Sequence, residues 1–316
     1  MSYWSAFEYC LAVTFPVFLI VFLGSFLKFK KYIDEGFVTS ASSLVFNICL
    51  PLLIFLSIID NEVSLLAQWP LVIFCVTAAV VSFLLFWNIS SKWVADEDRG
   101  VVVQGAFRSN LGIIGIALCA KGFGGQGLAI GALILSVVTP IYNVLSVYAL
   151  NFSQNNGRKV SWFKTLRDIT RNPLIIAISL GLLVGQLDFK LPIVLYDAGT
   201  YLANMTLPLA LIAIGGAISL RELRHSSALS IWTVVVKLWV TPVIVVIPAY
   251  WLGFRDVEIG CILLMFASPT ATASFIMVRA MGGNYQLASN IIVLSTIFSV
   301  LSISLLLYLL KLLALI

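Results

Sequence analysis

The sequence predicts an all-α membrane protein of ten transmembrane helices, built as two inverted five-helix repeats with crossing, broken helices 4 and 9. Three observations predict it. The 316 residues are 61% hydrophobic and only 10% charged, with a mean hydropathy of +1.06, whereas soluble domains carry about 25% charged residues. Continuous apolar runs reach the roughly 20 residues that a spanning helix needs. Short motifs recur in the two halves of the chain. This composition excludes a soluble globular enzyme, a disordered chain and a nucleic-acid-binding module, so no nucleic-acid partner is expected.

Apolar runs between charged or Gly/Asn-rich breaks predict the individual helices. They lie at 7–27, 36–58, 66–90, 100–120, 127–150, 169–187, 192–218, 228–250, 257–279 and 285–312. A transmembrane β-barrel would show alternating strands of about ten residues, so these Leu-, Ile- and Val-rich runs favour helices. The five cysteines lie singly inside apolar runs, which predicts buried free thiols rather than disulfides or a zinc site.

The positions of the positive charges predict the orientation. Of the 19 Lys and Arg residues, 13 follow odd-numbered helices, four lie on the other side and two lie inside helices. The positive-inside rule then places both termini outside and the odd-numbered loops in the cytoplasm. We therefore expect an integral protein of the plasma (inner) membrane. A first repeat at 1–150 is joined by a cytoplasmic linker at 151–168 to a second, inverted repeat at 169–316.

An internal repeat supports this division. Pro16 and Pro173 are 157 residues apart, and at the same offset the pattern N-x-x-L-P-L occupies both 47–52 and 204–209. Further matches follow at an offset of 159. Because each half contains five helices, an odd number, the second half must be inverted. Inverted repeats are typical of secondary transporters, which bind substrate near the midplane where the halves meet.

The fourth and ninth helices are predicted to be interrupted at equivalent repeat positions. Asn110 precedes Leu111-Gly112 and can cap a new half-helix, and Ser268 precedes Pro269, the preferred first residue of a helix. Both breaks lie roughly 12–17 Å deep, close to the bilayer centre. We expect unpaired backbone N–H groups to face each other there, where helix N-termini favour anions. The alternative is a simple proline kink in one helix and a contact glycine in the other.

Two cations lie inside predicted helices. Arg108 either pairs with a substrate carboxylate or neutralises helix C-terminal carbonyls. Lys237 either binds substrate, titrates during transport or replaces a cation at the crossing; alternatively it pairs with Asp197 or a carbonyl. Asp197 is either a proton carrier or an interfacial residue. No Asp or Glu lies at mid-depth, which disfavours cation exchange as the main activity.

The candidate site residues are polar or helix-breaking residues at the two breaks or on neighbouring helices. For substrate binding they are Arg108, Ser109, Asn110, Ser268, Pro269, Thr270, Asn47, Asn204, Tyr142 and Asn143, with Ser295 and Thr296 as further lining residues. Lys237 and Asp197 are the coupling or charge residues. The Asn side chains could equally form only helix–helix hydrogen bonds. No cofactor, metal or catalytic constellation is expected.

Several strings resemble the auxin efflux carrier family over nearly the whole chain. They lie at 108–115, 171–173, 207–211 and 267–271. The resemblance implies a fold like that of the bile-acid/sodium symporters. It also implies a scaffold domain from helices 1, 2, 6 and 7, through which a homodimer can form, and a transport domain from helices 3–5 and 8–10. Family members carry small organic anions, such as malate, malonate or auxin.

The sequence therefore predicts a secondary transporter of small organic anions that works by alternating access, with substrate at the crossing of helices 4 and 9. The alternative is a sodium-coupled organic-anion symporter of the bile-acid type. A channel or a transporter-like receptor is a third class, which flux rates would separate from a carrier.

Overall fold

The computed structural model describes residues 3–60, 68–153, 173–186, 191–217 and 227–316. These residues are almost entirely helical and form no strand; an isolated antiparallel bridge joins Ser109 and Thr270. The prediction of an all-helical chain is confirmed to this extent. Of the predicted linker, residues 151–153 end a helix, and the remainder lies outside the described residues.

The elements follow one another along the chain without long described loops. They are α1 (Tyr3–Phe29), α2 (Glu35–Leu44), η1 (Val45–Cys49), α3 (Leu50–Asp60), α4 (Trp69–Ser90), α5 (Asp96–Phe107), η3 (Leu111–Gly115), α6 (Ile116–Ser153), α8 (Pro173–Gln186), α9 (Ile193–Ala217), α10 (Ala228–Val235), η5 (Val236–Val240), α11 (Thr241–Trp251), α12 (Asp256–Ala267), α13 (Ala273–Ala280) and α14 (Tyr285–Leu312). The three η segments are single π-helical turns, which interrupt α-helices often at functional positions.

Among the described residues, seven helices are long and apolar enough to cross a membrane. Three predicted spans are shorter as continuous helices: the sixth corresponds to the 14 residues of α8, and the fourth and ninth are interrupted. The predicted boundary between spans four and five falls inside α6, where Gly124 leaves helical geometry at φ 61° and ψ −146°. Glycine reaches this region without the steric cost that a Cβ atom imposes. The ten-helix inverted repeat stays a prediction.

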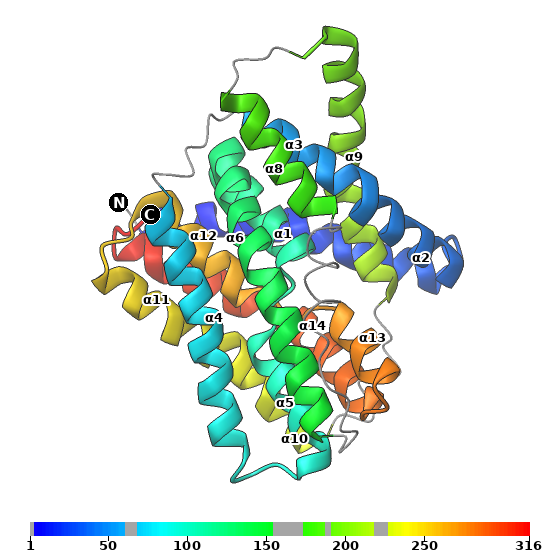
Figure 1. Ribbon diagram of the computed structural model, residues 1–316, viewed down its shortest axis with the longest axis vertical. Helices are drawn as coiled ribbons and strands as arrows, with labels where there is room; N and C mark the ends of the chain where they lie inside the picture. Colours follow the sequence, from blue (N-terminus) through cyan, green and yellow to red (C-terminus); the bar gives the residue numbers. More distant parts are fainter. Residues whose placement is uncertain (1–2, 61–67, 154–172, 187–190, 218–226) are drawn as a thin grey trace.

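One set of helices packs around α1 and α9. The helix α9 lies along α1, α2 and α3, and α8 lies along α3. In Figure 1, α1 crosses the middle of the molecule, and α2, α3, α8 and α9 occupy the upper and right-hand part. At the α1–α9 contact the two backbones touch. A Cβ atom on Gly215 would lie 1.9 Å from the Val21 carbonyl oxygen, and one on Gly24 would lie 2.3 Å from that of Ile212. The Ser25 hydroxyl also donates to the Gly215 carbonyl at 2.7 Å.

The other set packs around α6. It contacts α4, α5 and α12, while α14 contacts α10 and α12 and α11 lies along α12 (Figure 1). Aromatic side chains fill the space between α4, α5 and α6. The ring of Phe107 meets those of Phe83 and Tyr142 edge-on, with ring centroids 5.3 and 5.2 Å apart. The end of α5 is therefore fixed from two sides.

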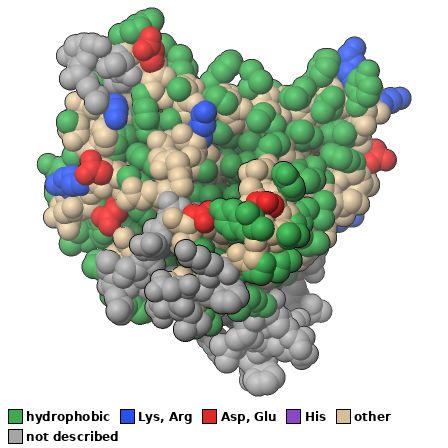
Figure 2. Space-filling view, turned by 90° about the horizontal axis from the view of Figure 1, so that it is seen from above, with side chains coloured by type: hydrophobic (Ala, Val, Ile, Leu, Met, Phe, Trp, Pro, Cys, Tyr) green, Lys and Arg blue, Asp and Glu red, His purple; other side chains and the backbone are tan. Residues whose placement is uncertain are grey.

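The exterior is apolar. Large hydrophobic side chains are exposed along α1, at Phe7, Phe15, Phe22 and Phe26, and on many other helices. Figure 2 shows one face, on which hydrophobic side chains predominate and the charged ones are scattered. Exposed apolar area on this scale is unfavourable in water and suits contact with lipid acyl chains.

Candidate functional site

The predicted interruptions are present in both helices. The helix α5 ends at Phe107, and helical geometry resumes at Leu111; α12 ends at Ala267, and α13 begins at Ala273. Each break leaves backbone groups that no helix satisfies, at positions where the side chains are buried. The partners of these groups define the site.

The two breaks pair with each other. The Asn110 N–H donates to the Pro269 carbonyl at 2.7 Å, and the Ala271 N–H donates to the Arg108 carbonyl at 3.1 Å. The Thr270 N–H donates to the Ser295 hydroxyl on α14 at 3.1 Å. The expectation of unpaired N–H groups is therefore wrong for these three residues, because the crossing segments satisfy each other's backbones.

The carbonyl ends of the half-helices are also satisfied. The Thr270 hydroxyl donates to the Gly105 carbonyl at 2.7 Å, and the Thr241 hydroxyl donates to the Ala106 carbonyl at 3.0 Å. Both carbonyls belong to the last turn of α5. The Phe266 carbonyl, in the last turn of α12, accepts from the Ser109 hydroxyl at 3.0 Å. Side chains from the opposite break and from α11 thus act as caps for these carbonyls.

The predicted capping roles are wrong in detail. Asn110 occupies the N-cap position of the helix that begins at Leu111, but its side chain makes no capping hydrogen bond. Ser268 ends α12 instead of starting the next helix, and its hydroxyl donates back to the Leu264 carbonyl at 2.7 Å. Pro269 is not a first helical residue, because the pairing between the breaks holds this segment non-helical until α13.

Arg108 is buried and bonds only to neutral groups in the described residues. Its Nη2 donates to the Asn143 Oδ1 at 2.7 Å, and its Nη1 donates to the Ser146 hydroxyl at 3.1 Å and approaches the Met277 sulfur at 3.0 Å. The structure thus brings together Arg108 and Asn143, two candidate substrate-binding residues from different predicted helices. Arg108 is also the C-cap of α5, where the helix dipole favours a positive charge.

Lys237 is completely buried in the π-helical turn η5. Its Nζ donates to the Ser109 hydroxyl and to the Phe266 carbonyl, the latter at 3.0 Å. Of the two pairings considered, the carbonyl is correct and Asp197 is wrong, because Asp197 is exposed on α9. The ammonium therefore lies at the C-terminal end of α12, which carries partial negative charge.

The remaining candidates divide by burial. Tyr142 is buried against Phe107, next to the crossing. Asn47 and Asn204 are exposed, and the Asn47 amide donates to the Ser43 carbonyl of its own helix at 2.9 Å. The structure therefore does not bring these two asparagines into the buried crossing. In the described residues, no Asp or Glu side chain is buried, so the crossing holds two cations without a carboxylate.

A cavity of about 390 Å³ lies beside the crossing, between α2 and α9 on one side and α13 and α14 on the other. Its lining residues are Glu35, Ile214, Ala217, Thr272, Phe275, Arg279, Tyr285, Gln286, Ser289, Ile292, Val293 and Thr296. Thr272 follows the paired segment, and Thr296 follows Ser295, so the cavity reaches the edge of the crossing. Of the predicted polar residues, only Thr296 lines it.

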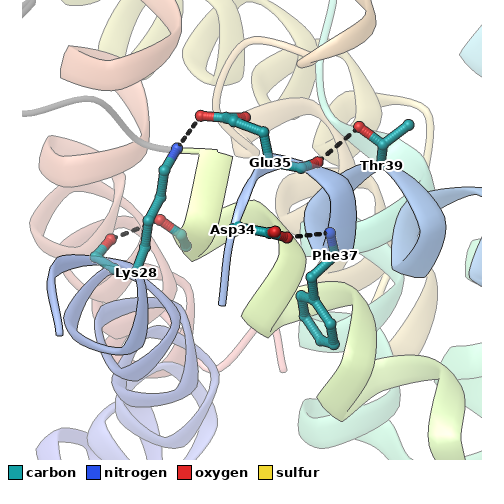
Figure 3. A network of polar contacts seen from close by, with 7 residues as sticks. Lys28, Asp34, Glu35, Phe37 and Thr39 are labelled. Atoms are coloured by element: carbon teal, nitrogen blue, oxygen red, sulfur yellow. Dashed lines mark hydrogen bonds and ion pairs between the residues drawn. The ribbon is translucent and has the colours of Figure 1, made fainter. Parts of the chain in front are cut away.

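Sequence reasoning missed Arg279 and Glu35 as cavity residues. Figure 3 shows how the Glu35 wall is built: Lys28, at the end of α1, forms an ion pair with Glu35 at the start of α2. Asp34 caps α2 by accepting from the Phe37 N–H at 2.7 Å. The sequence analysis counted Arg279 only among the positive charges that predict the orientation of the loops.

Away from the cavity, α1 contacts α6 and α14. The Tyr9 hydroxyl donates to the Gly122 carbonyl at 3.0 Å, and the Thr14 and Ser304 hydroxyls are 2.8 Å apart. The Lys311 ammonium lies 4.5 Å from the centre of the Tyr9 ring. Because Lys311 is near the end of α14 and the cavity is near its start, the two features lie at opposite ends of that helix.

Comparison with known proteins identifies the family of the chain. A relative from Methanothermobacter thermautotrophicus, described as an uncharacterized transporter, is 25% identical over 92% of this chain and 94% of its own length. A Rhizobium meliloti relative named "Putative malonate transporter" is 25% identical over 94% of each chain. The uncharacterized transporter YfdV of Escherichia coli K12 is 22% identical over 83% of this chain and 85% of its own. The family model described as "Membrane transport protein" matches residues 10–307. The chain therefore belongs to this family of membrane transporters, the auxin efflux carrier family.

Proposed function

We propose that the protein is a secondary transporter of small organic anions that works by alternating access, with substrate at the crossing of the two broken helices. One observation carries the proposal: Arg108 and Lys237 are buried at the crossing, and no described Asp or Glu is buried with them. A buried cation costs at least about 2.5–3.5 kcal/mol on insertion scales. A substrate carboxylate would supply the missing negative charge.

The proposed substrates are small carboxylates, such as malate, malonate or auxin-like acids. The name of the Rhizobium relative supports malonate as the first compound to test. The proposed site comprises Arg108, Ser109, Asn110, Asn143 and Thr270, and a carboxylate could replace the neutral acceptors that now face the Arg108 fork. Arginine binds carboxylates through two parallel hydrogen bonds, a geometry that lysine lacks.

The proposed moving parts are the two sets of helices. The set around α1 and α9, with α2, α3 and α8, would be the scaffold and the surface of a homodimer. The set around α6, with α4, α5 and α10–α14, would be the transport domain, and together they would form the ten-helix inverted repeat. Support comes from the cavity at one end of their boundary and the Tyr9–Gly122 contact at the other.

The proposed orientation places the cavity on the cytoplasmic side of the plasma (inner) membrane. The cavity lies at the start of α2 and α14 and at the end of α9, next to loops that the positive-inside rule assigns to the cytoplasm. The molecule would therefore be described in its inward-facing state, with both termini outside.

The test is uptake of labelled malonate into proteoliposomes under imposed membrane potentials and pH gradients. We expect saturable uptake, and we expect it to persist when potassium replaces sodium. Each charge moved is worth about 2.3 kcal/mol per 100 mV, so net anion movement should follow the potential. Absence of saturable flux with any small carboxylate would refute the proposal. Strict sodium dependence would favour the bile-acid type of symporter instead.

A further inference from the structure

We propose that the cavity between α2, α9, α13 and α14 is a separate binding site for a small carboxylate, in which Arg279 takes the carboxylate before the anion reaches the crossing. This inference rests on the proposed function for its physiological ligand. It names a residue and a place that lie outside the buried crossing. The cavity is called the access cavity below.

The first support is the position of Arg279. It lies in the last turn of α13, is exposed and lines the access cavity. Its guanidinium carbon is 6.0 Å from the centre of the Tyr285 ring, which lines the same cavity. In the described part of the chain Arg279 forms no ion pair. A guanidinium beside an aromatic ring keeps its hydrogen-bond donors available for a ligand.

The second support is the charge of the facing wall. Glu35 would repel an anion if it were unpaired, but its carboxylate forms an ion pair with Lys28 (Figure 3). The pair is close to neutral as a unit, so Arg279 leaves the described lining residues with a net positive charge. An anion that enters would be attracted to the α13 side, towards Thr272 and the crossing.

The third support is the size and lining of the access cavity. A volume of about 390 Å³ is at the lower end of ligand pockets, which span roughly 300–1,000 Å³. Hydroxyl groups line its deeper part, at Thr272, Ser289 and Thr296. This combination suits a short carboxylate with a second polar end, which Arg279 and the hydroxyls would hold from two directions.

The experiment uses a single reactive thiol as a reporter of occupancy. The five native cysteines are all buried, so the Gln286→Cys variant places one accessible thiol in the access cavity. Its labelling by a membrane-impermeant maleimide is measured in purified protein, with malonate as the ligand and malonamide as the uncharged control. We expect malonate to slow labelling and malonamide to have no effect.

The role of Arg279 is tested in the same background. With Arg279→Gln added, we expect the malonate concentration for half-protection to rise about three- to tenfold, the scale of one partly exposed charge-assisted hydrogen bond. Arg279→Lys should fall between the two. Lys92→Gln, which removes an exposed cation outside the access cavity, should leave protection unchanged. Size-exclusion profiles and melting temperatures confirm that each variant is folded.

Two results would overturn the inference: no protection by malonate, or equal protection with and without Arg279. The outcome is distinguishable from that of the proposed function. Transport without protection would refute the access site and support the transport function. Protection without transport would leave the site and remove the transporter.

Discussion

At the scale of single residues, the two buried cations both lie at the crossing but donate hydrogen bonds to different kinds of acceptor. Arg108 spreads its hydrogen bonds over the side chains of Asn143 and Ser146, whereas Lys237 donates to a hydroxyl and a backbone carbonyl. A guanidinium whose described hydrogen bonds all go to neutral side chains can exchange them for a carboxylate. An ammonium bonded to a helix carbonyl contributes to the crossing itself. We therefore expect substitutions at the two positions to have different consequences.

Arg108→Met should strongly reduce transport without unfolding the protein. We expect malonate uptake below about one tenth of the parent value, since charge-assisted hydrogen bonds contribute about 1.5–3 kcal/mol. The melting temperature should stay the same or rise, because the buried charge and its insertion cost are removed. Uptake assays and thermal unfolding in detergent measure the two effects. Ser146→Ala, which removes one hydroxyl acceptor, is the control; full transport by Arg108→Met would contradict the assigned role.

Lys237→Ala should destabilise the crossing. The substitution leaves the Phe266 carbonyl without its ammonium donor and creates a buried space, so we expect a loss of about 2–4 kcal/mol in the free energy of unfolding. Methylammonium should restore part of the melting temperature, because it can occupy the vacated position. Sodium should have no such effect on the parent protein. Stabilisation of the parent by sodium would show that Lys237 does not take the place of a coupling cation.

At the scale of elements, the close contact between α1 and α9 depends on two glycines. No side chain fits between these backbones, since a Cβ atom on Gly215 would lie 1.9 Å from the Val21 carbonyl oxygen. Gly215→Ala should therefore lower the free energy of unfolding by about 1–3 kcal/mol, the usual cost of overpacking. Gly185→Ala on α8 is the matched control, because no atom of another described helix lies within 4 Å of its Cβ position. Thermal unfolding compares the pair; equal melting temperatures would contradict the close contact.

The helices themselves were largely predictable, because each depends on a continuous apolar run that local sequence contains. The interruption of α5 and α12 was predictable for the same reason: Asn110 and Pro269 are local signals. The capping was not predictable, since it depends on which groups the other break supplies. The carbonyls of α5 are bonded by Thr241 and Thr270, from two other segments. No pattern in one helix contains that information.

The access cavity was missed for a similar reason on a larger scale. Glu35 and Arg279 belong to helices far apart in the chain and face one cavity only after both sets of helices have packed. In the sequence, charges of this kind predicted only how the chain is oriented in the membrane. The predicted polar residues Asn47 and Asn204 belong to the two copies of the N-x-x-L-P-L motif, yet both side chains are exposed. The repeated motif therefore did not indicate which side chains are buried.

At the scale of the whole molecule, the two ends differ: the access cavity lies at one end, and α1 bonds to α6 at the other. The Tyr9 hydroxyl bonds α1 to the Gly122 carbonyl of α6 across the boundary between the two sets of helices. Tyr9→Phe removes this hydrogen bond, worth about 0.5–1.5 kcal/mol, and retains the ring. We expect the population open at this end to rise several-fold, at the expense of the access-cavity state.

The measurement is again thiol labelling. With Gln286→Cys as the reporter, Tyr9→Phe should slow modification, because the access cavity is open in a smaller fraction of molecules. Tyr308→Phe, a tyrosine on α14 with no described hydrogen bond through its hydroxyl, is the control. Faster or unchanged labelling in Tyr9→Phe would contradict a role for the contact in holding this end closed.

The ion pair between Lys28 and Glu35 has a consequence for pharmacology. A polyanion too bulky to pass the crossing could still lodge beside Arg279, because the neighbouring acid is already neutralised. Such a compound would inhibit from one face of the bilayer and be inert from the other. When added outside, the compound would inhibit vesicles in which the cavity faces outward and would not inhibit vesicles of the reverse orientation. Inhibition from one side alone would therefore reveal how the protein is oriented in the membrane.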